Sequence, residues 1–147
     1  MNSNLYQLGV LMMALAPKRS LIIGRGPHVC DLGEALRKVG FAVVETSEYS
    51  QGIKSLAVSA PEVVIISEDI LDAWHPTTFV TIRELEEVPI LVLGSGEESS
   101  LVSAIEWGAD AYLDQRASSQ EHIARIRAVL RRLSMTRASQ YFWLRLQ

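Results

Sequence analysis

The residue types that most often carry chemistry are few in this chain and lie far apart. Cys30 is the sole cysteine among 147 residues, which excludes an internal disulfide and a zinc site built from four cysteines. His28, His75 and His122 show no metal-ligand spacing. The spacing supports neither a Ser-His-Asp arrangement nor a pair of catalytic carboxylates. We therefore expect no metal site and no enzymatic activity, and we expect Cys30 to be a small, partly buried residue.

One glycine-rich turn has a composition that could bind a phosphate group. Gly24-Arg25-Gly26 follows a short apolar run and precedes a predicted helix. Glu45 lies 21 residues after Gly24, where an acid could bind a ribose. Val29, however, stands where a third glycine would be needed, and Pro27 has no amide hydrogen to offer. Nucleotide binding is therefore the weaker interpretation of this turn.

Strands and helices that alternate along the chain would position these residues. Short apolar runs without polar alternation, such as Val63 to Ile66, are typical of strands that are covered on both faces. The expected strands are 20–23, 41–44, 63–66, 89–93 and 111–113. The expected helices are 28–39, 49–60, 76–85, 97–107 and 118–133, and helical spacing of apolar residues is clearest in the first and last. Right-handed crossovers then predict a parallel sheet with helices on both faces.

Several of these segments resemble the receiver domain of response regulators. The similar segments are Pro61 to Ile66 (PEVVII), Val88 to Leu93 (VPILVL), Trp107 to Leu113 (WGADAYL) and Glu121 to Arg132 (EHIARIRAVLRR). The last of them resembles the final receiver helix of the OmpR class, and the family spacing from Pro61 to Arg132 is kept without a gap. The resemblance covers residues 20–133. It implies a flavodoxin-like, doubly wound α/β fold with five parallel strands in the order 2-1-3-4-5.

The resemblance also implies where the phosphorylation chemistry of a receiver would lie. The acidic pair that holds Mg²⁺ falls on Gly24 and Arg25, the phosphoacceptor on Ser67, the hydroxyl on Gly94 and the lysine on Gln115. Phosphoryl transfer to a carboxylate brings anionic oxygens together and needs a hard cation and a lysine. Only Tyr112, at the position of the switch aromatic, is retained. We therefore expect a degenerate pseudo-receiver without a cofactor.

Charged residues near this degenerate pocket suggest a replacement for the metal. We expect Arg25 to occupy the vacated metal site and to pair with acids near Asp69 or Asp114. Glu68, Asp69 and Asp72 follow the third expected strand and could pair with Arg25 or Arg116 and imitate a permanently switched state. An acidic loop exposed to solvent is the simpler interpretation of these three residues.

The last helix differs in charge from the rest of the chain. Residues 18–117 hold 8 Lys and Arg against 16 Asp and Glu, whereas residues 118–147 hold six Arg and one Glu. The positions that OmpR-class receivers use in a two-fold dimer are matched by Asp110, Glu121, Arg125 and Arg127. Ser103 and Ala111 depart from that pattern. The helix can continue into Tyr141, Phe142 and Trp143, whose burial would strengthen an interface.

Both ends of the chain carry apolar residues that a receiver core does not need. We divide the chain into an apolar N-terminal extension (1–19), a receiver-like domain (20–133) and a C-terminal helical extension (134–147). The run from Leu5 to Ala16 lacks a basic segment before it, so we expect a packing segment rather than a signal peptide. No apolar run is long enough to predict a membrane span.

These observations lead to one expected function and one alternative. We expect a cytoplasmic homodimer that signals without phosphorylation by binding a protein partner. The net charge of −3 argues against direct binding of nucleic acid. The alternative is a sensor that binds a small ligand or a nucleotide at the carboxyl ends of the strands.

Overall fold

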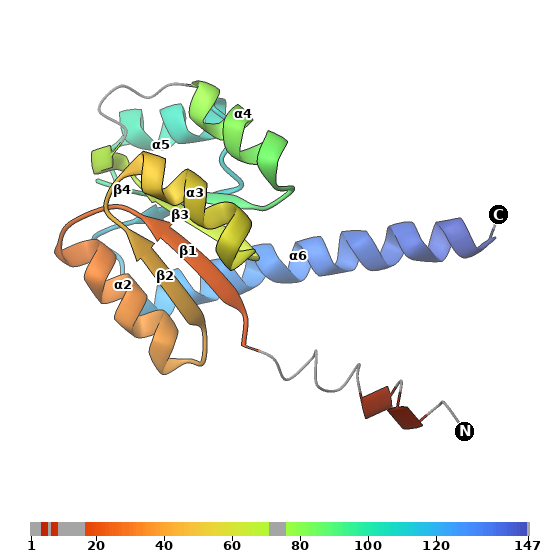
Figure 1. Ribbon diagram of the computed structural model, residues 1–147. Coiled ribbons are helices and arrows are strands. Elements are labelled where there is room, and N and C mark those ends of the chain that lie inside the picture. The colour runs from red at the N-terminus through yellow and green to blue at the C-terminus, as the bar shows by residue number, and fades with distance from the viewer. Residues whose placement is uncertain (1–3, 6, 9–16, 71–75, 147) are drawn as a thin grey trace.

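The computed structural model describes residues 4–5, 7–8, 17–70 and 76–146; the side chains of Pro76 and of residues 134–146 lie outside the description. The strands are β1 (Arg19–Ile23), β2 (Ala42–Thr46), β3 (Val63–Ser67), β4 (Ile90–Gly94) and β5 (Ala111–Asp114). The helices are α2 (Pro27–Lys38), α3 (Tyr49–Ser59), α4 (Pro76–Leu85), α5 (Glu98–Glu106) and α6 (Ser119–Leu146). All strand pairs are parallel, in the order β2-β1-β3-β4-β5 (Figure 1). The predicted fold class and strand order are therefore confirmed.

Two apolar clusters cover the two faces of the sheet. Side chains along a strand alternate between faces, so Ile22 joins the cluster beneath α2 and α6, whereas Leu21 and Ile23 join the cluster beneath α3, α4 and α5. Every residue of β3 and of β4 is buried. The central strands therefore offer no exposed face, and loops at the strand ends are left to position polar groups.

The start of α2 shows how the sequence directs the chain from the sheet into a helix. Gly26 has φ +98°, a left-handed conformation that favours glycine, and Pro27 begins the helix with a fixed φ that suits the first turn. Val29, Leu32 and Leu36 are buried at helical spacing. Cys30 falls between these positions and is exposed, so the expectation of a partly buried cysteine is wrong.

One short element was not expected: a 3-10 turn, η1 (Glu68–Ile70), follows β3 directly. Helix α6 is 28 residues long and continues beyond 133 into the segment expected to be a helical extension, and Figure 1 shows its second half projecting past the sheet. Leu130 and Leu133, near the middle of α6, pack partly buried against the cluster beneath α2.

The terminal segments expected to add apolar surface are described only in part. The side chains of Tyr141, Phe142 and Trp143 lie outside the described residues, and so does most of the N-terminal extension. Within that extension Leu5 and Leu8 are described, and both are exposed. None of the described helices combines the length and the apolar character needed to cross a membrane.

Helix α3 approaches β1 so closely that position 52 has room only for glycine. A Cβ at Gly52 would lie 2.7 Å from Cγ1 of Ile23, a side chain with no exposed surface. Atoms at that distance overlap, and Ile23 is held on every side by the core.

We predict that Gly52→Ala lowers the free energy of unfolding by about 1–3 kcal/mol, the usual cost of overpacking a core. Alanine is the better helix former by about 1 kcal/mol, so a loss of stability would isolate the steric effect. Urea denaturation measures it, with the exposed neighbour Gln51→Ala as a control that should change stability by less than about 0.5 kcal/mol. A Gly52→Ala variant as stable as the parent chain would contradict the close approach.

Candidate functional site

The carboxyl ends of neighbouring strands bring the predicted pocket residues to one edge of the sheet. Ser67, the last residue of β3, is level with Leu93 of β4, and Gly94 is level with Asp114 of β5. The Gln115 amide donates to the carbonyl of Gly94 at 2.9 Å. Gly24 follows β1 directly. The structure therefore brings together the positions Gly24, Ser67, Gly94 and Gln115, which the family resemblance implied would form one pocket.

Atoms are closely packed around Gly24 and Ser67, at the carboxyl ends of β1 and β3. Ser67 is only 4% exposed. A Cβ at Gly24 would lie 2.5 Å from the Cβ of Ser67 and 2.8 Å from Cγ2 of Val29. Any larger residue at position 24 would displace the end of β3 or the first turn of α2. Glycine here lets two strands and a helix meet without a gap.

The turn after β3 reaches across to the loop after β4. Glu68 begins η1, and its Oε2 accepts a hydrogen bond of 2.8 Å from the backbone amide of Ser95. A carboxylate that accepts from a backbone amide forms a charge-assisted hydrogen bond, which is stronger than a neutral one. Glu68 therefore ties η1 to the β4–α5 loop.

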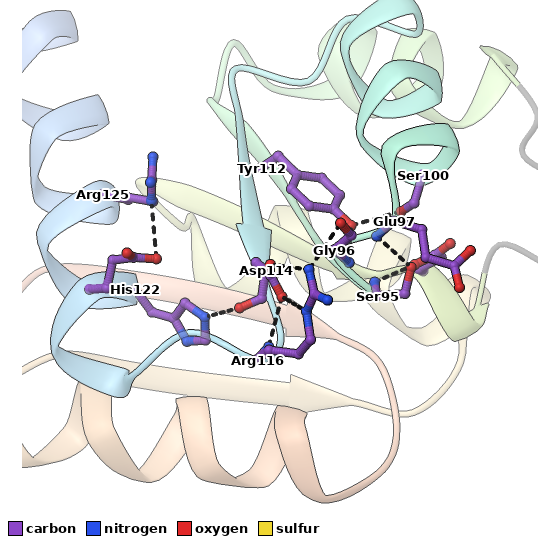
Figure 2. A network of polar contacts seen from close by, with 11 residues as sticks. Ser95, Gly96, Glu97, Ser100, Tyr112, Asp114, Arg116, His122 and Arg125 are labelled. Carbon is purple, nitrogen blue, oxygen red and sulfur yellow. Dashed lines mark hydrogen bonds and ion pairs between the residues drawn. The ribbon is translucent and has the colours of Figure 1, made fainter.

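Tyr112 approaches the same loop from β5. Its hydroxyl accepts a hydrogen bond of 2.8 Å from the amide of Gly96 and shares one of 2.8 Å with Oγ of Ser100. Figure 2 shows the ring pointing toward the start of α5, with Ser100 above it. Ser100 is 6% exposed. The hydroxyl thus satisfies one loop amide and one buried side chain together.

A local ion pair follows β5. Arg116 donates to the Asp114 carboxylate from its Nη2 at 2.9 Å, from its Nε at 3.1 Å and from its backbone amide at 2.8 Å. The side-chain hydrogen bonds of Arg116, followed by that backbone bond, lower the pKa of Asp114 to about 2. Arg116 Nη2 also donates to the carbonyl of Gly96 at 3.1 Å, and His122 Nε2 lies 2.6 Å from the carbonyl of Asp114 (Figure 2).

Arg25 does not take the place that the sequence suggested. Its side chain is exposed, and no ion pair forms between Arg25 and the described acids. Asp114 pairs with Arg116 instead. Asp72 lies outside the described residues, and Asp69 is exposed. The expectation that Arg25 pairs with Asp69 or Asp114 is therefore wrong.

The structure offers little support for a ligand at this edge. Among the described residues, no group of three His, Cys, Asp or Glu side chains could hold a metal ion. Glu45, the candidate ribose-binding acid, is paired with Arg37 at 3.5 Å. A cavity of about 270 Å³ lies instead near the amino ends of the strands, where Arg19, Glu62 and Leu130 are among its lining residues.

The predicted interface residues lie around the free edge of β5. Asp110 has internal partners: it accepts from the Ile90 amide at 2.8 Å and pairs with Arg83 at 3.0 Å. On α6, Glu121 and Arg125 pair at 3.5 Å, and Arg127 is exposed. Alongside, α5 exposes three apolar side chains that sequence reasoning did not single out: Leu101, Val102 and Ile105.

Sequence comparison finds that the chain is similar to transcriptional regulatory proteins. The chain is 31% identical over 104 residues to the phosphate regulon transcriptional regulatory protein PhoB of Klebsiella pneumoniae, which covers 67% of this chain and 45% of that protein. It is 32% identical over 108 residues to the KDP operon transcriptional regulatory protein KdpE of Escherichia coli, which covers 73% of this chain and 48% of that protein. The chain thus spans a little under half the length of these curated relatives. No family model matches it.

Solved structures agree on the fold. A CheY-like response regulator receiver domain protein from Methanospirillum hungatei superposes with a TM-score of 0.70 at 15% identity, over 82% of this chain and 98% of that one. The BeF3-activated receiver domain of Klebsiella pneumoniae RstA gives a TM-score of 0.68 at 22% identity, over 78% of this chain and 99% of that one. The sequence similarity and the shared fold together show that this chain belongs to the response-regulator receiver family.

Proposed function

We propose that this chain is a receiver-type signalling domain that acts through protein contacts and needs no phosphorylation. The observation that carries the proposal is Ser67, which is buried at the end of β3 where the family resemblance implies the phosphoacceptor aspartate. A serine hydroxyl remains protonated at neutral pH, so it cannot replace the carboxylate nucleophile without a base to activate it. The relatives are regulators of transcription by name, which supports a place in two-component signalling.

The surroundings of Ser67 support the same interpretation. Gly24 and the exposed Arg25 stand at the positions implied for the Mg²⁺-binding acids, and Gln115 stands at that of the lysine. These residues therefore lack both the acids that would hold a metal cation and the lysine, the two groups that neutralise the oxygens of an incoming phosphoryl group. The close contacts of Gly24 also leave no room for an acidic side chain that could restore the metal site.

The alternative, a sensor for a small ligand at the carboxyl ends of the strands, receives no comparable support. A Cβ at Gly94 would lie 2.7 Å from Oγ of Ser100 and 2.8 Å from Oε2 of Glu68. Side chains of the chain itself therefore occupy the space directly beside Gly94. A ligand bound at that position would first have to displace them.

We predict that the full chain takes up no phosphate when it is incubated with Mg²⁺ and acetyl phosphate. Intact-mass measurement checks this, and a receiver with a complete acidic site, treated in parallel, should gain a phosphoryl group. A phosphate adduct on the parent chain would contradict the proposal. Asp69, exposed in η1, would then be the residue to test, because Asp69→Asn should abolish an adduct formed there.

We also propose that two copies of the chain associate at the free edge of β5, which leaves the signalling partner unidentified. Burial of the exposed side chains Leu101, Val102 and Ile105 would supply the apolar contribution. The opposite charges of Glu121 and Arg125 on α6 suit a surface that meets its own copy across a two-fold axis, the commonest symmetry of soluble assemblies. The participation of the terminal segments, including Tyr141, Phe142 and Trp143, in this interface remains a prediction.

We predict that the full chain is a dimer at tens of micromolar and that Ile105→Glu weakens it at least about tenfold, because a charge would be buried in an apolar contact. Light scattering and sedimentation measure the mass. The matched control is Val58→Glu: Val58 is 89% exposed on α3, away from the β5 edge, and its substitution should leave the dimer unchanged. A monomeric parent chain, or equal loss in both variants, would contradict this interface.

A further inference from the structure

Three side chains from separate parts of the fold hold the β4–α5 loop, residues 95–97. Glu68 of η1 accepts from the Ser95 amide, and Tyr112 of β5 accepts from the Gly96 amide, each at 2.8 Å. Arg116, after β5, donates to the Gly96 carbonyl at 3.1 Å. Figure 2 shows Tyr112 and Arg116 converging on Gly96 from either side. Two consecutive amides and one carbonyl of the loop are thus bound by side chains of the chain itself.

Glycine at position 94 is what allows these groups to meet. A Cβ there would overlap Oγ of Ser100 and Oε2 of Glu68, and it would come closest of all to the Tyr112 hydroxyl. Position 94, where the resemblance implies a hydroxyl side chain, therefore carries no side chain, and other side chains occupy the space beside it. Removing the side chain creates the space in which the Glu68 carboxylate and the Tyr112 hydroxyl reach the loop.

Gly96 is the second requirement of this arrangement. Its φ is +86°, a conformation that costs other residues energy, and a Cβ on it would overlap the Asp114 carboxylate and Arg116. The two glycines therefore let the loop pass between η1 and the turn after β5. Larger residues at either position would separate the loop from its three partners.

The carboxylate that binds the β4–α5 loop is a side chain of the protein, Glu68. Ser67, the phosphoacceptor position, immediately precedes Glu68, and the end of β3 lies beside the end of β4. A phosphoryl group on residue 67 would deliver anionic oxygens to this edge of the sheet. Glu68 delivers a carboxylate to the same edge, and that carboxylate already binds a loop amide.

We propose that Glu68 is a permanent internal anion that latches the β4–α5 loop in one conformation, with Gly94 as the residue that makes room for the latch. This inference rests on the proposed phosphorylation-independent function and specifies how the site would be regulated. Helix α5 begins at Glu98, directly after the loop, and carries Leu101 and Ile105 on its exposed side. The latch therefore fixes the start of the helix that presents this apolar surface, whether or not phosphate is present.

Amide hydrogen exchange of the full chain, followed residue by residue by NMR without any phosphodonor, tests the latch. In the parent chain the Ser95 and Gly96 amides should exchange slowly. In Glu68→Ala the Ser95 amide should exchange roughly tenfold to a hundredfold faster, the range expected for loss of a hydrogen bond to a charged group. In Glu68→Gln, which keeps an uncharged acceptor, the Ser95 amide should lose less of its protection from exchange than in Glu68→Ala.

Two further variants separate the latch from a general effect of charge or of folding. Asp69→Ala removes the exposed acid next to Glu68 and should leave the Ser95 amide protected. Gly94→Ala should release Ser95 and Gly96 together while the amides of β1 and β3 stay protected, which shows that the fold is intact. Unchanged Ser95 exchange in Glu68→Ala, or equal acceleration in Asp69→Ala, would overturn the latch. Either result would leave the phosphate measurement unaffected, so the latch and the proposed function can fail separately.

Discussion

The central strands are covered by helices on both faces, and this constraint decides where the polar groups of the candidate site can lie. Buried parallel strands tolerate apolar, mostly β-branched side chains, and β3 and β4 contain almost nothing else before their last residues. Ser67 and Gly94 end these strands and are the first points at which loops and polar groups can meet. The candidate site is a product of the same burial that stabilises the sheet.

At the carboxyl ends of the strands, side chains of the chain itself hold the backbone of a loop in place. The β4–α5 loop presents two amides and a carbonyl, and the chain supplies a carboxylate, a phenol and a guanidinium to match them. Buried polar groups without partners are costly, so each of these pairings also removes a penalty. These pairings order the β4–α5 loop through contacts within the chain.

Much of the fold was predictable because strong local signals agreed with one another. The runs at 63–66 and 89–93 could hardly be anything but buried strands, and the spacing of Val29, Leu32 and Leu36 defined the inner face of α2. The resemblance to receivers then placed Ser67, Gly94 and Gln115 at the strand ends. What spacing cannot show is the direction of a side chain, and so the contact between Glu68 and Ser95 was not anticipated.

The wrong expectation for Arg25 has a similar cause. A distant pairing of Arg25 with Asp114 competes with Arg116, only two residues from the same carboxylate, and the nearby arginine also donates its backbone amide. Ordering a short segment costs less conformational entropy than ordering two long side chains from separate loops. The number of charged residues near a pocket does not reveal which of them form ion pairs. Their separation along the sequence is more informative.

The turn that holds Arg116 also anchors α6, because His122 in the first turns of the helix contacts the Asp114 carbonyl. At 1.5 Å per residue the helix is about 42 Å long, and only its first half rests on the sheet. The part of the helix beyond residue 133 is about 20 Å long, so a tilt of about 10° where it leaves the sheet would move its far end by roughly 3 to 4 Å. Small rotations of the packed half of α6 are therefore largest at the end that lies furthest from the sheet.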